Sequence, residues 1–476
     1  MSTDKRKSNQ LMELKKGDRI HFVGIGGAGM SCLAQVYTAL GYEISGSDIK
    51  ESANTKSLEK TGARVYIGHD VDNVEGASVV VVSSAIRDDN PEVIQAEEND
   101  IPVIQRAELL AILMRLKRGI AVAGTHGKTT TTSMIGRMLE DCGEDPTYLI
   151  GGELNDIGSG ARSGKGEFLV AEADESDASL LNLDPEIAVV TNIEADHLDF
   201  YKSLAEIEDV FHRFLEKIPD NGYAVLCYDD PNIRRLIPKL TCKFRTYGFE
   251  PDADYVAQDI RLTSGETTFQ VLKDGKEIGR ASLKVPGLHN VYNALGTIAV
   301  GLELGLDFQC ISAAVASFGG VRRRFQQKGI ESKITVVDDY AHHPSEVLAT
   351  LDAARTGEWN RIISVFQPHR YSRTHCLHEA FGRSFGKADI VIITDVYAAD
   401  EEPIPGVDGK LVVDSILMSE PHKDIAYLPK KTDVSQYLLG MLDEGDLLLT
   451  LGAGDVWVVG EEVLSGLRLE ADKDPS

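Results

Sequence analysis

Short apolar runs that end in small or polar residues recur along this chain and alternate with stretches of helical periodicity. In the N-terminal part the runs are Arg19–Val23, Glu43–Ser47 and Val79–Val82, and an apolar helical pattern covers Ala28–Leu40. Apolar runs of this length, bounded by turn residues, are typical of buried parallel strands. Because strands and helices alternate, the sequence predicts a doubly wound sheet, which we expect to end near Arg106.

A second block repeats this alternation and adds a hairpin. The strands and helices that we predict in it are Ile120–Ala123, Thr129–Leu139, Phe168–Ala171, Ile187–Thr191 and Val291–Leu304. The runs Thr267–Leu272 and Glu277–Leu283 flank the pair Asp274–Gly275, and an Asp-Gly pair between two such runs is a strong turn signal. This block is therefore predicted to have a parallel core with an antiparallel addition.

A third block follows a cluster of three arginines, Arg322–Arg324. Its predicted strands, separated by helical stretches, are Ile334–Val337, Ile362–Phe366, Ile390–Thr394 and Leu447–Leu451. The two glycines of Phe318–Val321, just before the arginines, predict a hinge. We therefore predict three α/β domains over residues 1–106, 107–321 and 322–476, in which a central domain with a mostly parallel sheet stands between two Rossmann-like domains.

Composition and charge narrow the functional classes. Hydrophobic residues make up 42% and charged residues 26% of the chain, as in a soluble globular protein, and the net charge of −26 disfavours nucleic acid as a partner. No stretch offers about 18 uninterrupted apolar residues, so we expect no membrane span. The six cysteines form no Cys-x-x-Cys pair, which suits isolated small positions in a reducing cytoplasm. They are Cys32, Cys142, Cys227, Cys242, Cys310 and Cys376.

A glycine-rich loop follows the first predicted strand and opens the first predicted helix. The hexapeptide from Gly24 to Gly29 fits the pattern Gly-x-Gly-x-x-Gly, whose first glycine permits a tight turn and whose second lets the backbone approach a diphosphate at the helix N-terminus. Asp48 ends the next strand, where an acid that binds a ribose is expected. By itself this loop indicates a dinucleotide or a nucleoside diphosphate, and a dehydrogenase is the default interpretation.

A second glycine loop changes that interpretation. Gly124–Thr129 also follows a predicted strand and opens a helix, although Val122 occupies the place of the first glycine of the full phosphate-loop pattern. Gly127 admits phosphates, successive backbone N–H groups cradle them, Lys128 reaches the β- and γ-phosphate oxygens, and Thr129 offers a hydroxyl to Mg²⁺. The position of the loop between strand and helix therefore predicts ATP binding in a P-loop ATPase-like domain.

Acidic residues follow the next two buried strands of the second block. Glu172–Asp177 comes after one strand and Asn192–His197 after the other. Carboxylates at the carboxyl ends of sheet strands lie over the nucleotide crevice, and Mg²⁺ prefers such oxygen ligands together with phosphate and water. We therefore predict one metal site beside the phosphate loop, with His197 as a ligand or a phosphate contact.

Two clusters of histidine and arginine follow strands of the third block. They lie in the segments Asp338–Pro344 and Gln367–Arg373. Guanidinium and imidazole groups at strand ends suit a small anionic substrate, such as an amino-acid carboxylate. The candidate residues are His343, His369, Arg370 and Arg373.

The set and order of these motifs resemble the Mur ligase family over essentially the whole chain. The segments that carry the resemblance are Gly124–Thr129, Glu172–Asp177, Asn192–His197, Leu288–Asn293, Arg322–Phe325, Asp338–Pro344 and His369–Arg373. Within the family, the opening segment His21–Met30 is typical of the member that joins L-alanine to the lactyl carboxylate of UDP-N-acetylmuramate in peptidoglycan precursor synthesis. The resemblance implies an ATP-dependent ligase that forms an amide through an acyl phosphate and releases ADP and phosphate.

The resemblance also implies a role for each group of residues. The first domain would bind the UDP-sugar through Gly24, Gly26, Gly27, Gly29, Asp48 and Ser84. The central domain would bind ATP through Gly124, Thr125, His126, Gly127, Lys128, Thr129, Thr130, His289, Asn290, Asn293 and Arg324. Mg²⁺, or Mn²⁺ in its place, would be held by Thr129, Glu172 and His197. The third domain would bind the amino acid, and the catalytic residues would be Lys128, Glu172, His197 and Arg324.

Alternatives stay open at this point. A sister ligase that adds a peptide to the same sugar nucleotide would need a larger acceptor site. An NAD-dependent oxidoreductase is supported by the first glycine loop and Asp48 but not by the second loop, and a non-catalytic binding protein explains none of the acidic strand ends. The base that takes the ammonium proton would be His197 or His343. We expect a cytoplasmic monomer or weak homodimer whose partners are UDP-N-acetylmuramate, L-alanine and ATP, with neither nucleic acid nor a membrane.

Overall fold

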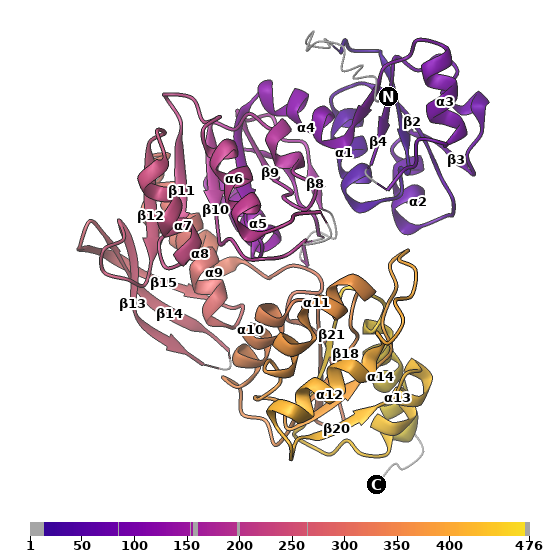
Figure 1. Ribbon diagram of the computed structural model, residues 1–476. Coiled ribbons are helices and arrows are strands. Elements are labelled where there is room, and N and C mark those ends of the chain that lie inside the picture. Colours follow the sequence, from indigo (N-terminus) through magenta and orange to yellow (C-terminus); the bar gives the residue numbers. More distant parts are fainter. Residues whose placement is uncertain are drawn as a thin grey trace.

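Three β-sheets follow one another along the chain, and helices pack against each of them. The computed structural model describes residues 14–83, 85–152, 154–155, 160–197, 200–263 and 265–471. In Figure 1 the N-terminal part lies at the upper right, the central part at the left and the C-terminal part below. The predicted α/β class, with a mostly parallel central sheet, is confirmed.

The N-terminal sheet has five parallel strands. Its elements, with α4 leading out of it, are β1 (Arg19–Val23), α1 (Ala28–Ala39), β2 (Glu43–Asp48), α2 (Ala53–Lys60), β3 (Arg64–Ile67), β4 (Val79–Val82), α3 (Pro91–Glu98), β5 (Val103–Gln105) and α4 (Arg106–Arg115). The strand order is β3-β2-β1-β4-β5, so the order reverses at β1. The loop after β1 therefore opens at a switch point, which is where ligands bind in open α/β sheets.

Among the described residues, the central sheet has ten strands, and its parallel core carries an antiparallel hairpin. Its elements are β6 (Arg118–Ala123), α5 (Lys128–Asp141), β7 (Thr147–Leu149), β8 (Ala161–Arg162), β9 (Phe168–Glu172), β10 (Ile187–Val190), α6 (Leu204–Leu215), β11 (Tyr223–Cys227), α7 (Pro231–Leu236), β12 (Phe244–Gly248), β13 (Tyr255–Leu262), β14 (Thr267–Lys273), β15 (Lys276–Leu283), α8 (Leu288–Glu303) and α9 (Phe308–Ser317). The predicted hairpin is confirmed as β14 and β15.

Three neighbouring strands of the central sheet bring the predicted metal and phosphate groups to one edge. β6 lies between β10 and β9, and both pairings are parallel. Because the carboxyl ends of parallel strands meet at the same edge, the phosphate loop after β6 stands between the two acidic loops after β9 and β10. These strands are almost entirely buried, which explains their continuous apolar sequences.

The C-terminal sheet has six strands in the order β16-β17-β21-β18-β19-β20. Its elements are β16 (Gln326–Glu331), β17 (Ile334–Asp339), α10 (Pro344–Ala354), β18 (Ile362–Phe366), α11 (Tyr371–Gly382), β19 (Ile390–Ile393), α12 (Gly409–Ser419), β20 (Asp424–Tyr427), α13 (Lys431–Leu439), β21 (Leu447–Leu451) and α14 (Trp457–Ala471). All pairings are parallel except that of β16 with β17.

The prediction of six isolated cysteines is wrong for one pair. Cys142 follows α5, Cys310 lies in α9, and the two form a disulfide although 168 residues separate them. Helices α5 and α9 pack against each other, which brings the two Cα atoms to 5.9 Å. Sequence spacing carries no information about this pairing, because it depends on how two distant helices dock.

Two further expectations concern membrane spans and the residue Ser84. Within the described ranges, no helix is long and apolar enough to cross a membrane. Ser84, which was expected to contact the UDP-sugar after β4, lies outside the described residues.

Candidate active site

The phosphate loop joins β6 to α5. Gly127 precedes the helix with φ 81°, a left-handed conformation that glycine adopts without strain. The backbone N–H groups of Thr125 and His126 donate to the backbone and side-chain oxygens of Asn192, at 3.1 and 2.8 Å. The N–H groups at the start of α5, beginning at Lys128, have no intrahelical acceptor, so they are the donors that this loop offers to a phosphate.

Lys128 lies folded back over its own loop. Its Nζ donates to the carbonyl oxygens of Gly124 and Thr125, at 2.6 and 3.2 Å, and to Glu175 Oε1 at 2.7 Å. Burial lowers the pKa of the Lys128 ammonium, but the Glu175 carboxylate outweighs burial and the net shift is upward, so the lysine stays charged. Burial also raises the pKa of Glu175 to about 7. A phosphate bound to this loop would therefore compete with Glu175 for the ammonium group.

Thr129 and Glu172 line one cavity of about 520 Å³ between the central part and α1. Glu172 Oε1 accepts a hydrogen bond from the Gly151 N–H at 2.6 Å, and burial raises the pKa of this carboxyl. Nearby, Glu175 Oε2 is buried without a hydrogen-bond partner among the described residues. The Thr129 hydroxyl, the partly buried carboxylate of Glu172 and the buried carboxylate of Glu175 are oxygen donors of the kind that a divalent cation such as Mg²⁺ prefers.

His197, the third predicted metal ligand, lines a different cavity. Its Nε2 lies 3.8 Å from Glu175 Oε1 and 3.6 Å from Asp196 Oδ2. Burial lowers the pKa of His197, so the imidazole is neutral at pH 7, which is the form that can bind a metal or accept a proton. The structure therefore places Thr129 and Glu172 on one cavity and His197 on another, and Glu175 lies against both Lys128 and His197.

A cavity of about 360 Å³ opens beside the phosphate loop. The predicted ATP-binding residues in its lining are His126, Gly127, Thr130, His289, Asn290, Asn293 and Arg324. Burial, together with the nearby Arg324, lowers the pKa of His289 to about 4, so this ring is uncharged. Tyr292 and Asp229 also line the cavity, and the Tyr292 hydroxyl donates to Asp229 Oδ2 at 2.8 Å. Neutral rings with a few polar groups are suited to a nucleoside.

Arg324 lines both the 360 Å³ cavity and the 520 Å³ cavity. Its Nη1 lies 3.5 Å from Glu346 Oε1, and its guanidinium lies 5.4 Å from the centre of the Tyr340 ring. The preceding residue, Arg323, has φ 60° and donates from Nε to Asp338 Oδ2 at 2.9 Å. Arg323 thus fixes the chain where it enters the third sheet, and Arg324 stands where the two cavities adjoin.

The first glycine loop is held by its own sheet. The Gly24 N–H donates to the carbonyl oxygen of Ser47 at 2.8 Å, and the Gly26 N–H donates to Asp48 Oδ2 at 2.9 Å. A Cβ at Gly26 would lie 2.8 Å from the same oxygen, so the close approach requires glycine. Asp48 therefore supports the shape of the loop in addition to its predicted role at a ribose.

The start of α1 faces the phosphate loop across a cavity of about 300 Å³. Gly29 at the end of the first glycine loop lines this cavity together with Arg106, Lys128, Glu172 and Asp174. Arg106 Nη2 lies 3.8 Å from Asp174 Oδ2, so a cation from the first part and a carboxylate from the central part pair across the boundary. The two predicted phosphate sites therefore open into one shared space.

A small cavity of about 100 Å³ lies between the loop after β10 and the start of α11. The residues that line it are Ala195, Asp196, His197, Arg370, Ser372, Arg373, Cys376 and Leu377. Arg373 Nε lies 3.5 Å from Asp196 Oδ1, and this guanidinium outweighs burial and holds the pKa of Asp196 well below its usual range. Guanidinium groups and a carboxylate around one small cavity fit the two charged ends of an amino acid.

The other two residues predicted to bind the amino acid do not line this cavity. His369 stacks on Tyr397, and its Nδ1 lies 3.4 Å from Nη1 of Arg373, which lines the cavity. His343 packs against His126, with ring centres 4.8 Å apart. Burial lowers the pKa of both histidines, to about 3 for His369, so both rings are neutral at pH 7.

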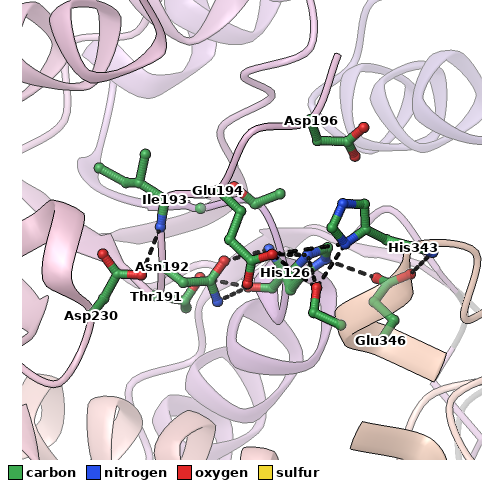
Figure 2. A network of polar contacts seen from close by, with 12 residues as sticks. His126, Thr191, Asn192, Ile193, Glu194, Asp196, Asp230, His343 and Glu346 are labelled. Carbon is green, nitrogen blue, oxygen red and sulfur yellow. Dashed lines mark hydrogen bonds and ion pairs between the residues drawn. The ribbon is translucent and has the colours of Figure 1, made fainter. Parts of the chain in front are cut away.

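The side chain of His126 leaves the phosphate loop and enters a polar network with the C-terminal part (Figure 2). Its Nδ1 lies 3.1 Å from Glu346 Oε1, and its Nε2 lies 3.1 Å from Ser345 Oγ and 3.6 Å from Glu194 Oε2. Potential ligand atoms of His126, Glu194 and His343 lie within 4.8 Å of one another. Burial lowers the pKa of His126, but Glu346 and Glu194 outweigh it and raise it to about 9, so the protonated ring has no lone pair for a metal.

Sequence reasoning missed several residues that the structure brings into the site. They are Arg106, Glu175, Asn192, Glu194, Asp196, Asp229 and Glu346. Glu175, Asn192, Glu194 and Asp196 lie inside the acidic segments that the sequence singled out, but nothing there distinguishes them from their neighbours. Glu346 carries a weak signal, since an acid at the third helical position is typical of a helix N-terminus.

Comparison with known proteins defines the class of this fold and site. Residues 19–118 match the model of the Mur ligase family, catalytic domain; residues 122–301 match that of the Mur ligase middle domain; and residues 323–454 match that of the Mur ligase, glutamate ligase domain. These matches cover most of the chain, and the chain belongs to the Mur ligase family.

Curated and solved relatives point to one member of that family. The chain is 52% identical over 453 residues to the UDP-N-acetylmuramate--L-alanine ligase of Geotalea uraniireducens, covering 95% of this chain and 99% of that protein. It is 49% identical to the enzyme of the same name from Desulfotalea psychrophila, with 96% and 100% coverage. The crystal structure of UDP-N-acetylmuramate-alanine ligase from Thermotoga maritima matches with a TM-score of 0.81 and 31% identity, covering 95% of this chain and 99% of that one.

Proposed function

We propose that this protein is an ATP-dependent ligase that joins L-alanine to the lactyl carboxylate of UDP-N-acetylmuramate through an acyl phosphate, in peptidoglycan precursor synthesis. The observation that carries the proposal is the shared cavity in which Gly29 of the first glycine loop faces Lys128 and Glu172 of the second phosphate site. A dehydrogenase has no use for a phosphate loop at this place. A ligase needs the carboxylate of a nucleotide sugar beside the γ-phosphate of ATP.

The residues around the phosphate loop would stabilise phosphoryl transfer. The sugar carboxylate attacks the γ-phosphorus of ATP, the bond to the β–γ bridging oxygen breaks, and ADP leaves. Lys128 would turn from Glu175 to the phosphate, and Arg324 would meet the transferring group where the two cavities adjoin. Charge-stabilising groups fixed in advance are the largest contribution to such reactions.

We propose that Mg²⁺, with Mn²⁺ as a substitute, is held by Thr129 and Glu172, with His197 as the third ligand that the sequence predicts. The buried oxygen donors around Glu172 and Glu175 support this assignment. The ion would supply positive charge to the phosphate oxygens.

The amino acid would bind in the 100 Å³ cavity between the loop after β10 and the start of α11. Arg370 and Arg373 would hold its carboxylate, and Asp196, which stays ionised, would accept hydrogen bonds from its ammonium group. Once deprotonated, the amine attacks the acyl carbon, and collapse of the tetrahedral intermediate expels phosphate. His197, if it held the metal, would have no lone pair free for the ammonium proton, and His343 does not line this cavity, so we assign the proton to solvent.

A ligase that attaches a peptide to the same sugar nucleotide is the second candidate. Its basis is the fold, since a murein peptide ligase from Psychrobacter arcticus matches with a TM-score of 0.70 at 24% identity. The size of the amino-acid cavity, about 100 Å³, favours a single small amino acid over a peptide. Both ligases use soluble nucleotide substrates, and we propose a cytoplasmic enzyme that acts as a monomer or a weak homodimer.

Phosphate release from ATP tests the proposal. The purified protein is incubated with Mg²⁺, ATP and UDP-N-acetylmuramate, with no amino acid, with each standard amino acid, or with L-alanyl-γ-D-glutamyl-diaminopimelate. We expect phosphate release that depends on L-alanine, with mass-spectrometric detection of UDP-N-acetylmuramoyl-L-alanine. Release that depends on the peptide alone would support the second candidate, and no release with any acceptor would refute both.

A further inference from the structure

One side chain of the phosphate loop serves an interface between domains instead of the phosphate cradle. His126 comes from the loop after β6, Glu194 from the loop after β10 and Glu346 from the first turn of α10 (Figure 2). Ser345 belongs to the same turn of α10. The Ser345 hydroxyl donates to Glu194 Oε2 at 2.9 Å, and Glu346 Oε1 lies 3.1 Å from His126 Nδ1. These contacts cross the interface between residues about 150 to 220 positions apart.

Glu346 connects this interface to the hinge arginine. Its Oε1 lies 3.5 Å from Arg324 Nη1, as well as against His126. Its Oε2 accepts hydrogen bonds from the backbone N–H groups of His342 and His343, at 2.9 and 3.3 Å. The carboxylate is therefore fixed at the start of α10 while it touches both the phosphate loop and Arg324. The Glu346 side chain is only 11% exposed, so water screens these contacts weakly.

The charges at this interface are matched. Burial opposes ionisation of Glu346, but His342 and His126 outweigh burial and hold the pKa of this carboxyl well below its usual range. His126 carries the complementary charge at neutral pH, since its pKa lies at about 9. A buried pair of this kind is costly to break from one side only, because the remaining charge stays unpaired.

We propose that His126 and Glu346 form a latch that docks the C-terminal domain on the phosphate loop and holds Arg324 in place for the γ-phosphate of ATP. Both act as positioning residues, since Glu346 works through Arg324 and His126 works through Glu346. The proposal rests on the proposed function only in naming the γ-phosphate as the group that Arg324 meets. The two glycines before the arginines leave the hinge itself compliant, so docking must come from contacts such as this pair.

Charge-neutral variants of the two partners test the latch. In Glu346→Gln and in His126→Asn we expect kcat to fall roughly 10- to 100-fold. The kcat of the double variant should be no lower than that of the less active single variant, as for residues that act as one unit. Calorimetric binding of UDP-N-acetylmuramate should not change, because the first glycine loop lies in another domain. Asp352→Asn is the matched control: it removes a carboxylate from the same helix, in an exposed pair with Lys387 at 2.6 Å, and should leave kcat unchanged.

Small-angle scattering measures docking through the radius of gyration and does not require the protein to turn over its substrates. With saturating UDP-N-acetylmuramate and a non-hydrolysable ATP analogue, the wild type and Asp352→Asn should share one small radius of gyration. Glu346→Gln should keep a larger radius. The same radius in all three proteins, with normal kcat in Glu346→Gln, would overturn the latch.

The pH dependence of docking provides a readout that a purely structural role would not give. The charged or titratable groups that face the pair are Glu194 after β10, His343 and His342 at the start of α10, and Arg324 before β16. His126 has a raised pKa, so its contribution is complete below about 6.5, the usual histidine value, and is lost as the pH rises through about 9. Docking of the wild type should weaken over that range, whereas the radius of gyration of Glu346→Gln should stay large and change little with pH. An identical profile in the two proteins would refute the charge pairing.

Failure of the proposed function gives a different pattern. A wild-type protein that releases no phosphate with L-alanine contradicts the ligase assignment, while the scattering and pH measurements on the ATP analogue still decide the latch. An active wild type whose Glu346→Gln variant docks and turns over normally contradicts the latch and leaves the ligase assignment intact.

Discussion

The two glycine loops occupy equivalent positions between a strand and a helix, but they differ in glycine conformation and in the side chains that they contact. Both follow a parallel strand at a switch point and open a helix, yet Gly27 before α1 has extended backbone at φ −62°, whereas Gly127 before α5 is left-handed at φ 81°. The first loop ties its Gly26 N–H to Asp48 and carries no cation of its own. The second loop carries Lys128 and stands beside Glu172 and other buried acids.

In the proposed ligase, this difference would separate a phosphate that is only bound from a phosphate that is transferred. A diphosphate that only has to be held is satisfied by backbone N–H groups and a helix N-terminus. A phosphoryl group in transfer spreads charge over its oxygens, so the site needs cations that are fixed in advance, and it also needs acids that can hold a metal. The two loops therefore share a strand–loop–helix arrangement, and they differ in the conformation of the glycine before the helix and in the side chains around them.

The substitution with the largest expected effect is Lys128→Ala, which tests whether phosphoryl transfer depends on the second loop alone. Loss of one well-placed charge-stabilising group costs roughly 3–4 kcal/mol of barrier, so we expect kcat to fall by roughly 10²–10³-fold. The affinity for UDP-N-acetylmuramate should be unchanged, because Lys128 does not belong to the first glycine loop. Turnover is measured by phosphate release and sugar-nucleotide affinity by calorimetry. A folded variant with near-normal kcat would remove the distinction between the two loops.

The second prediction concerns the metal, which only the second loop should require. Glu172→Gln removes a carboxylate that burial already disfavours as an anion. The Mg²⁺ concentration for half-maximal activity should rise about 10- to 100-fold, as is common when a metal site loses a partner. Binding of UDP-N-acetylmuramate, measured with and without Mg²⁺, should respond little to the change. An unaltered Mg²⁺ titration would exclude Glu172 as a metal ligand.

Most of the fold could be predicted from the sequence, and so could the site residues that lie in a loop directly after a buried strand. Buried parallel strands are short continuous apolar runs, so Val79–Val82, Ile362–Phe366 and Leu447–Leu451 are predicted at their observed ends. The phosphate loop and the acidic strand ends were placed for the same reason, since a strand fixes the edge at which its following loop stands.

The contacts that could not be predicted from the sequence depend on how elements far apart in the chain pack against each other. The Cys142–Cys310 disulfide requires the packing of α5 on α9, and the contact of His126 with Glu346 joins residues 220 positions apart. The sequence predicts that His343 contacts the amino acid, and it gives no sign that the His343 ring also lies against His126. Such partners are set by side-chain direction and domain contact, which hydrophobic periodicity does not encode.

The third prediction extends the comparison to a site that has no glycine loop. Arg373 faces the small cavity and pairs with Asp196, so Arg373→Ala should raise the KM for L-alanine and leave the KM for ATP nearly unchanged. Hydrogen bonds to charged groups contribute about 1.5–3 kcal/mol, which corresponds to roughly a 10- to 100-fold change. Steady-state kinetics with each substrate varied in turn measures both constants. A change confined to ATP would move Arg373 to the nucleotide site.

The smallest effects should come from the glycines themselves, and a matched pair of substitutions compares the loops directly. In Gly127→Ala the new Cβ meets Asn293 Oδ1 at 2.6 Å and the residue must keep φ 81°, whereas in Gly26→Ala the Cβ meets Asp48 Oδ2 at 2.8 Å. A left-handed alanine costs about 1–2 kcal/mol, so Gly127→Ala should raise the KM for ATP roughly five- to thirty-fold.

Gly26→Ala should raise the KM for UDP-N-acetylmuramate by a smaller factor, because its φ is not left-handed and only the contact with Asp48 must relax. Each variant should spare the substrate of the other loop, and the double variant should show the sum of the two free-energy changes, as expected for independent sites. Thermal unfolding of all three variants checks that the fold is kept. If Gly26→Ala instead raised the KM for ATP as much as Gly127→Ala does, the two loops would be coupled through the cavity that Gly29 and Lys128 share, and the separation of a binding loop from a transfer loop would have to be given up.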